Sequence, residues 1–165
     1  MKKTKISFEQ LRAIAKTYPK LKKKAAFNGD NLIIAMDNGS GPEEVAFATN
    51  SKITMDVTGA KATTKDSLGW EEIIAGNAKW TMDTDNLVDF HPSTGYHGCA
   101  DVAAALLSKT KVTVYFTIKT GAVDGDQQFW GVAYVTKCEL SAKQGEAVTY
   151  TSQFTGTGAL TQITI

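Results

Sequence analysis

Near the end of the chain, residues 131–160 read GVAYVTKCELSAKQGEAVTYTSQFTGTGAL. Small and β-branched residues dominate the first part, which leads into a turn sequence at Lys143-Gln144-Gly145. Apolar and polar residues then alternate from Ala147 to Phe154, as in a half-buried strand. Gly156 and Gly158 follow, where a bend or close backbone packing is expected. The pattern predicts two strands joined by a turn, and it contains no catalytic motif.

The chain continues this strand-and-turn pattern over most of its length. With 165 residues, 42% of them hydrophobic and 21% charged, it is long enough for one domain with its own core. We expect a mainly β fold with two short helices in the connections. The predicted strands are Leu32–Met36, Val45–Thr49, Lys52–Thr58, Trp80–Asp85, Lys111–Lys119 and a strand beginning near Trp130. The predicted helices are Asp66–Gly76 and Asp101–Lys109, and the predicted turns and loops include Asn38–Pro42, Gly59–Lys61, His91–Gly95 and Asp124-Gly125.

The first 24 residues form a strongly basic arm. They hold nine of the 18 Lys and Arg residues and one acid, a charge of +8, which leaves −7 on the rest of the chain. The helix signal of the arm is a capping box and a narrow apolar stripe: Ser7 with Gln10, then Phe8, Leu11 and Ile14. This charge asymmetry is typical of a segment that binds nucleic acid or another acidic surface, and equally of a solvated face. We therefore divide the chain into an arm, residues 1–28, and a β domain, residues 29–165.

The two cysteines, Cys99 and Cys138, lie far apart in sequence and form no CxxC motif. Two reduced thiols are expected, as in a protein that folds in a reducing cytoplasm, with a structural disulfide as the alternative. No apolar run approaches the roughly 20 residues that span a membrane, and the N-terminal lysines precede no apolar signal segment. We expect no membrane association.

Motifs for catalysis or metal binding are missing from the sequence. Asp83-Thr84-Asp85 and Asp124-Gly125-Asp126 lack the further acids of a calcium loop. His91, His97 and Cys99 lack a fourth zinc ligand. There is no G-x-S-x-G sequence, and Asn38–Gly41 lacks the helix and lysine of a phosphate loop. We expect no catalytic residue, cofactor or metal, and therefore no enzyme.

Four segments carry a resemblance to a known family. They are Asn31–Ile34 with Gly41-Pro42-Glu43, Asp56-Val57-Thr58 with Thr64–Trp70, Ile73–Gly76, and Gly145–Tyr150 with Phe154–Gly156. In order and spacing these segments resemble the tail tube (major tail) proteins of long-tailed bacteriophages over residues 29–165. Residues 1–28 have no counterpart in that family pattern. The segment formed by residues 85–96 is longer and more polar than the pattern predicts.

The resemblance implies a β-sandwich or barrel-like tail tube fold. It also implies a structural virion protein whose hexameric rings stack into a tube that conducts DNA into the host. Other tail proteins, such as the tape measure and the tail terminator, would be partners, and the protein would reside in the host cytoplasm before assembly and in the virion tail afterwards. DNA would pass through the lumen without specific binding.

The resemblance also suggests which residues make contacts. The strand and loop from Ile53 to Lys65 would touch the next ring. Independently of the resemblance, the complementary charges of +8 and −7 and the apolar stripe of the arm predict that the arm docks on an adjacent subunit. The candidate inter-subunit residues are Phe8, Leu11, Ile14, Ile53, Met55, Val57, Lys65 and Trp70. Trp70, Trp80 and Trp130 are alternatively core residues. The candidate lumen or loop acids are Asp83, Asp85, Asp124 and Asp126, which are alternatively ordinary surface carboxylates.

Two other functions stay open. The basic arm is compatible with a nucleic-acid-binding module, although Phe8 and Tyr18 fall on the apolar stripe rather than between the lysines, where stacking platforms would lie. A carbohydrate-binding or enzymatic β-sandwich has no residue in its favour.

Overall fold

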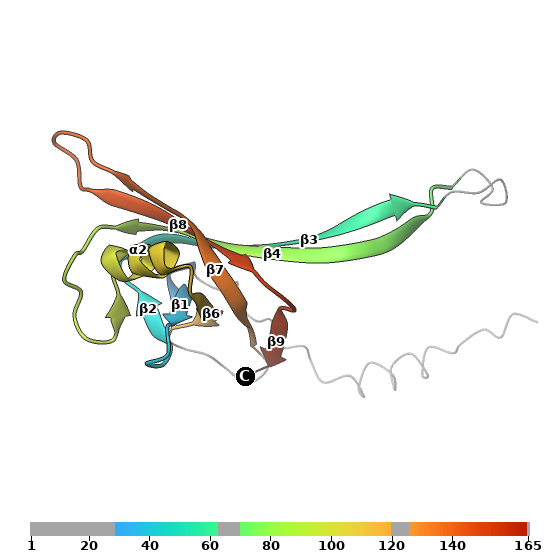
Figure 1. Ribbon diagram of the computed structural model, residues 1–165, viewed down its shortest axis with the longest axis horizontal. Coiled ribbons are helices and arrows are strands. Elements are labelled where there is room, and N and C mark those ends of the chain that lie inside the picture. Colours follow the sequence, from blue (N-terminus) through green and yellow to red (C-terminus); the bar gives the residue numbers. More distant parts are fainter. Residues whose placement is uncertain (1–28, 63–69, 120–125, 165) are drawn as a thin grey trace, which may run out of the picture.

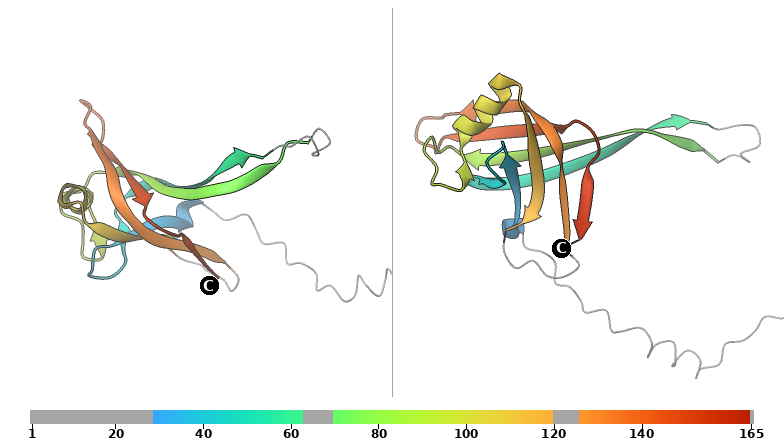
Figure 2. Two further views of the ribbon diagram at one scale, coloured as in Figure 1. Left: turned by 45° about the vertical axis from the view of Figure 1, so that its right-hand side comes forward. Right: turned by 60° about the horizontal axis from the view of Figure 1, so that its bottom comes forward.

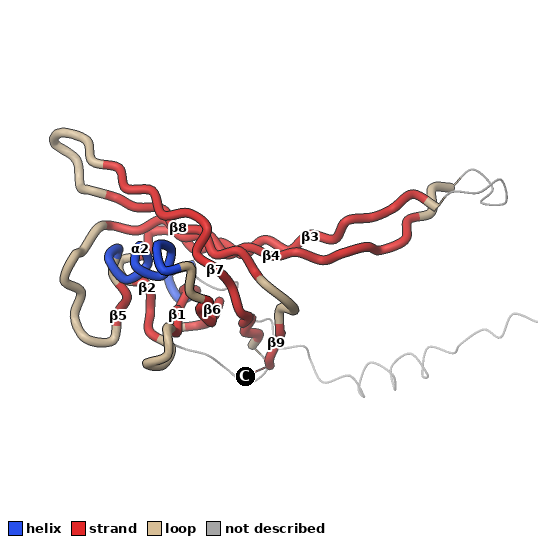
Figure 3. The backbone as a smooth tube through the Cα atoms, viewed as in Figure 1, coloured by secondary structure: helices blue, strands red, loops and turns tan. Residues whose placement is uncertain are grey.

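The computed structural model describes residues 29–62, 70–119 and 126–164. In this part of the chain the fold is mainly β, with one α-helix and one short 3-10 helix (Figures 1 and 3). The elements are η1 (Gly29–Asn31), β1 (Leu32–Asp37), β2 (Glu43–Val45), β3 (Ala48–Lys61), β4 (Ile73–Leu87), β5 (Tyr96–His97), α2 (Cys99–Ser108), β6 (Lys111–Ile118), β7 (Gln127–Ser141), β8 (Thr149–Gly156) and β9 (Thr161–Thr164).

The strands form one curled sheet in the order β3-β4-β8-β7-β6-β1-β2-β5, with β9 paired to β7. Neighbouring strands are antiparallel except for β2 and β5. The long strand β7 belongs to two layers, because Phe129–Tyr134 pairs with β6 while Ala133–Ser141 pairs with β8. The layer β3-β4-β8-β7 therefore crosses over the layer that contains β6 and β1 (Figure 2). This curled, sandwich-like arrangement agrees with the fold class predicted from the sequence.

A β-bulge in β7 sets which side chains face the core. Val135 pairs with Phe154 and Lys137 pairs with Gln153, so Thr136 is the extra residue. Before the bulge, alternate residues such as Ala133 and Val135 are buried. After it the phase shifts by one residue, and Cys138 packs against the core instead.

The core lies between the two layers and is closed on one side by α2. Each contributing strand places every second residue inward, as the period of a half-buried strand requires. The buried apolar core consists of Ile34, Met36, Val45, Trp80, Met82, Cys99, Val102, Val112, Val114, Ala133, Val135, Tyr150 and Phe154.

The structure confirms most of the predicted elements. Helix α2 spans Cys99–Ser108 where Asp101–Lys109 was expected, and Lys109 ends it in the left-handed conformation. The strand predicted at Lys111–Lys119 is β6, and the β7–β8 hairpin turns around Gly145, whose φ is +81°. Strand β9 has no counterpart in the prediction. The arm, residues 1–28, and the Asp124-Gly125 turn lie outside the described residues.

Two predicted features are wrong. Ile73–Gly76, expected to end a helix, begins strand β4, and Gly59–Lys61, expected to be a loop tip, continues β3. The two segments pair with each other, with Gly59 opposite Ala75 and Lys61 opposite Ile73. Ladder hydrogen bonds between the strands therefore outweigh the local helix signal. The strand expected at Val45–Thr49 is also divided, because Phe47 takes a positive φ of +54° between β2 and β3.

Candidate assembly surfaces

The most prominent surface feature is the hairpin of β3 and β4. These strands contain 14 and 15 residues, and their outer halves extend far beyond the body of the protein (Figure 1). Near the body, Trp80 and Met82 on β4 are buried. Beyond Trp80 both strands lose their contact with the core, because β8 pairs with β4 only from Thr81 to Leu87. The outer half of the hairpin is therefore a two-stranded ribbon.

The ribbon carries large apolar side chains without a cover. We define the hairpin patch as Met55, Val57, Trp70, Ile73 and Ile74, all exposed. The Val57 residue is 60% exposed, Ile73 65% and Trp70 79%. Ile73 and Ile74 are consecutive residues of β4, so exposed apolar side chains occur on both faces of the ribbon. Exposed apolar side chains grouped in this way mark an interaction surface. Ion pairs of Lys61 with Glu71 (2.8 Å) and Lys79 with Asp56 (4.0 Å) link the two sides of the hairpin, and Glu71 lies just before β4.

The structure sorts the predicted contact residues. Met55, Val57 and Trp70 share the hairpin patch, whereas Ile53 packs partly against the core. The alternative of a core position is wrong for Trp70 and correct for Trp80. The remaining candidates, Phe8, Leu11, Ile14 and Lys65, lie outside the described residues. The sequence pattern predicted a helix for Ile73 and Ile74, so their place in the hairpin patch was not predicted.

A second surface is the side of the layer β3-β4-β8-β7 that faces away from the core. We call it the polar face and define it by Lys52, Asp83, Asp85, Thr136, Lys137, Glu139, Gln153 and Thr155. Gln153 donates a hydrogen bond of 2.7 Å to Asp83, and Asn50 donates one of 3.0 Å to Asp85. Thr136 and Thr155 share a hydrogen bond of 2.8 Å between their hydroxyls. These bonds hold the carboxylates in fixed positions along the sheet.

Charges on the polar face are nearly balanced, with a small acidic excess. Three acids, Asp83, Asp85 and Glu139, stand against two lysines, Lys52 and Lys137. The hydrogen bond between Lys137 and Glu139 raises the pKa of the lysine and lowers the pKa of the glutamate. Lys52 lies opposite Asp83 in the strand register. Both lysines of the polar face thus have a carboxylate as a neighbour, Asp83 for Lys52 and Glu139 for Lys137.

The other two predicted acids do not join this face. Asp126 lies just before β7 and is only 7% exposed, so its carboxylate contributes little to the charge of the protein surface. Asp124 lies outside the described residues. Of the four candidate lumen or loop acids, the structure brings together Asp83 and Asp85.

The layer β3-β4-β8-β7 has two unpaired edges among the described strands. β3 pairs only with β4 along its length. The outer end of β7, Lys137–Ser141, pairs with β8 on one side, while β6 reaches only as far as Tyr134. Unpaired strand edges are ready to pair with another chain. The layer can therefore be continued at both margins.

The buried ionisable groups of the described strands and helix include two thiols and one imidazole. Cys99 and Cys138 are free thiols in contact with each other, and burial raises the pKa of both, to about 11 for Cys138. Such thiols are poor nucleophiles. His97 is buried with its Nε2 atom 3.8 Å from Glu43 and its Nδ1 atom 3.9 Å from Asp101. Within the described residues there is no group of three or more His, Cys, Asp or Glu side chains that could hold a metal ion.

A projecting apolar hairpin, two open sheet edges and a polar sheet face together define a structural β protein equipped for assembly. In the described part of the chain, none of the helices is both long and apolar enough to cross a lipid bilayer. The chain belongs to the phage tail tube protein family, whose pattern matches residues 26–162. The resemblance seen in the sequence is thereby confirmed, and the protein is a structural component of phage tails.

Solved structures share the fold. A chain in the virion of a native gene transfer agent particle has a TM-score of 0.68 at 16% identity, covering 84% of this chain and 99% of its own. A chain in the tail of an empty gene transfer agent particle with C6 symmetry has a TM-score of 0.68 at 19% identity, covering 82% and 98%. A chain in the SPP1 tail tube has a TM-score of 0.62 at 10% identity, covering 84% and 80%. Comparison with curated proteins finds no match.

Proposed function

We propose that six copies of this chain close into a ring and that the rings stack into a tube through which DNA passes into the host. The observation that carries this proposal is the four-stranded layer with one open edge at β3 and the other at the outer end of β7. The C6 symmetry of the similar gene transfer agent tail supports a ring of six.

The strand directions favour closure by rotation. β3, β4, β8 and β7 alternate in direction, because each neighbouring pair in the layer is antiparallel. When copies are related by an axis along the strands, β7 of one copy therefore meets β3 of the next in the antiparallel sense. Repetition around a ring gives one continuous antiparallel barrel without an exposed edge.

The proposed barrel has its polar face toward the lumen. The opposite side of the layer is covered by β1, β6 and α2, so it cannot border an open channel. Phosphate groups bind to accessible Lys and Arg side chains, and each such contact makes binding stronger and salt-dependent. On the polar face Lys137 is paired with Glu139 and Lys52 lies opposite Asp83. DNA would therefore slide without being held.

The hairpin patch would make the contact between rings. The hairpin projects from one end of the molecule, and it must contact a different surface on the next ring. Because this contact joins two different surfaces, each added ring still has one of them free for the next ring, and the stack can continue to grow. Tape measure and tail terminator proteins would then limit the length of the tube, and the subunits would reside in the host cytoplasm before assembly.

The basic arm is a separate part of the proposal. Its charge of +8 complements the −7 of the remaining chain, and Phe8, Leu11 and Ile14 supply apolar contacts. We expect the arm to dock on an adjacent subunit, so deletion of residues 2–24 should weaken tubes and reduce their sensitivity to salt. If the deleted chain assembles normally and the intact arm retards duplex DNA in a gel, the arm is a nucleic-acid-binding module instead.

A single substitution on the ribbon tests ring stacking. Val57→Lys places a charge in the hairpin patch at a position exposed in the single chain. Sedimentation and negative-stain microscopy should show rings but few tubes, with an unchanged melting temperature. The control is Ile163→Lys, which charges an exposed apolar position on β9 outside the hairpin patch. Tubes of normal length from Val57→Lys would contradict the role of the hairpin, and a parent chain that stays monomeric at high concentration would contradict the whole proposal.

A further inference from the structure

Helix α2 has a largely apolar outer face that is not covered by any described segment of the single chain. Cys99 and Val102 pack into the core. The exposed residues of α2 are Ala100, Ala104, Leu107 and Ser108, and the Leu107 residue is 78% exposed. A helix on a protein surface normally carries charged and polar residues on its solvent side. The outer face of α2 departs from that rule at Ala100, Ala104 and Leu107, and its exposed polar residue, Ser108, lies at the end of the helix.

A groove of about 550 Å³ lies at the β3 margin of the layer β3-β4-β8-β7, whereas α2 lies at the β7 margin. It runs between β1 and the first residues of β3, where Ala48 and Ser51 border it. Its lining is mixed: polar and charged side chains alternate with the apolar residues Leu32, Ile33, Ala46, Phe47, Ala48, Pro92 and Tyr96. The Phe47 residue is 57% exposed at the entrance to β3.

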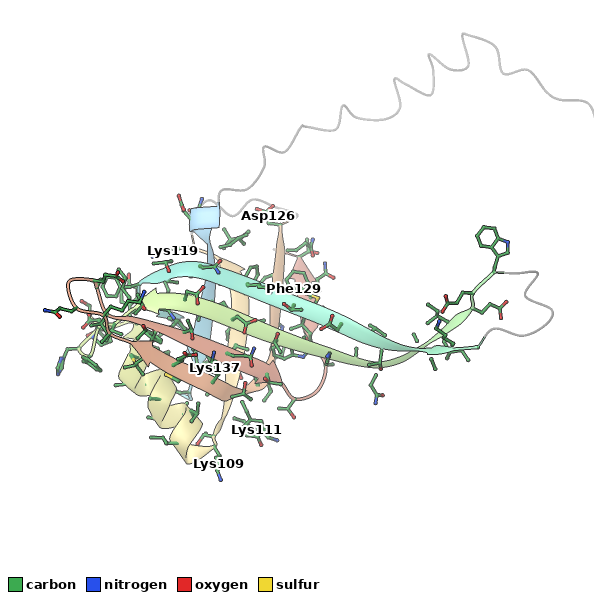
Figure 4. The ribbon with its side chains drawn as sticks, turned by 90° about the horizontal axis from the view of Figure 1, so that it is seen from above. Lys109, Lys111, Lys119, Asp126, Phe129 and Lys137 are labelled. Atoms are coloured by element: carbon green, nitrogen blue, oxygen red, sulfur yellow. The ribbon has the colours of Figure 1, made fainter. Side chains whose placement is uncertain are left out.

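The outer face and the groove lie on the same side of the layer β3-β4-β8-β7. Helix α2 packs against β7 on the core side, through Cys99 and Cys138. The groove lies between β3 and β1, which belong to the two facing layers, so it opens on the core side as well. In Figure 4, Lys109 and Lys111 mark the end of α2 at one margin, and Lys119, which lines the groove, lies at the other.

We propose that the outer face of α2 docks into the groove of the neighbouring copy within a ring. This inference rests on the proposed function, because the ring joins the outer end of β7 to β3 of the next copy. That junction continues the layer, and it brings α2 of one copy next to the groove of the other on the same side.

The charges of the two surfaces also favour docking of α2 into the groove. Lys109 and Lys111 follow the outer face of α2 and are exposed. The groove contains two acids, Asp30 and Glu44, against one lysine, Lys119, whose ammonium lies 2.7 Å from Glu44. In the docked arrangement Lys109 and Lys111 would lie near these carboxylates, and the contact of opposite charges favours one orientation of the helix. The interface has an apolar centre around Leu107 and Phe47 and charges at its rim.

Leu107→Glu tests the inference directly. Leucine and glutamate have similar helix propensities, and residue 107 is exposed, so the single chain should keep its melting temperature. Loss of one buried leucine per interface should raise the concentration needed for ring formation about 10- to 100-fold. Sedimentation velocity measures this shift, with Ile163→Glu on β9 as the control that should assemble like the parent.

A cross-link identifies the groove as the partner. The double variant Leu107→Cys with Phe47→Cys, exposed to molecular oxygen with a copper catalyst, should form intermolecular disulfides, two thiols losing their hydrogens to oxygen. A ladder of up to six linked copies is expected on a non-reducing gel, and neither single variant should give it. Rings from Leu107→Glu at parental concentrations, or no ladder from the double variant, would overturn the inference while leaving the ring proposal intact. A parent chain that forms no rings would overturn both.

Discussion

The indole of Trp80 occupies the space that a β-carbon on Gly156 would need. Its other edge lies against Gly131, and its Nε1 atom donates a hydrogen bond of 3.0 Å to the carbonyl oxygen of Gly158. Trp80 belongs to β4, Gly131 to β7 and Gly156 to β8. One side chain thus joins three neighbouring strands where the sheet curls. This close approach explains Gly131 and Gly156, whereas Gly158 is explained by its positive φ of +103°.

Gly156→Ala should therefore destabilise the fold. The added methyl group would overlap the indole ring, and overpacking of a well-packed core typically costs about 1–3 kcal/mol. Urea denaturation would measure the loss. Gly29→Ala is the matched control, because a β-carbon at residue 29 meets nothing within 4 Å. Equal stability of Gly156→Ala and the parent would show that Trp80 does not pack there.

Two tryptophans should give opposite results when truncated. Trp80→Ala empties part of the core and should cost about 3–5 kcal/mol of unfolding free energy. Trp70→Ala removes a side chain from the exposed hairpin patch, so the melting temperature should stay unchanged while the tubes become less stable. Thermal unfolding and electron microscopy of both variants decide the matter. A large loss of melting temperature in Trp70→Ala would show that Trp70 is a core residue after all.

Local sequence patterns predicted those strands, helices and turns that are determined mainly by their own residues. The alternation around Met82, the apolar helix after Cys99 and the turn at Gly145 all appear as expected. The length of the β3–β4 hairpin was not predictable, because Ile73 and Ile74 become strand only through pairing with β3. The helix face around Leu107 and the groove could not be recognised as contact surfaces from the sequence, because their positions depend on the pairing of strands that are distant in sequence.

The stability of the protein should fall at alkaline pH. Burial raises the pKa of Cys138 from 9.0 to about 11 and also raises that of Cys99. The contribution of the neutral Cys138 thiol is fully present below pH 9, where the unfolded chain also keeps its proton, and it is lost as the pH rises through about 11. Burial also raises the pKa of Tyr150, which adds to the loss above pH 10.

Urea denaturation at several pH values between 8 and 11 measures this effect. The slope contributed by one group is at most about 1.4 kcal/mol per pH unit. Cys138→Ala should flatten the decline between pH 9 and 11, while the part due to Tyr150 stays. Identical pH dependence in the parent and the variant would show that the thiol is not held neutral by burial.

Reversal of charge on the polar face should make the lumen retain DNA. Asp85→Lys would place a cation in the cross-strand row that also contains Thr151 and Glu139. Tubes should still form, but short duplex DNA should bind to them in a salt-dependent manner. Asp85→Asn is the control, because it removes the charge without adding a cation. No difference in DNA retention between the two variants would exclude the polar face from the lumen.

Reconstruction of the assembled full-length chain by cryo-electron microscopy tests the central claim most directly. We predict a six-fold tube in which β7 of each copy pairs with β3 of the next, with Asp83, Lys137 and Gln153 lining the lumen. The β3–β4 hairpins should reach from each ring to its neighbour. A tube whose lumen is lined by α2, or an assembly in which the edges of β3 and β7 stay unpaired, would contradict this account.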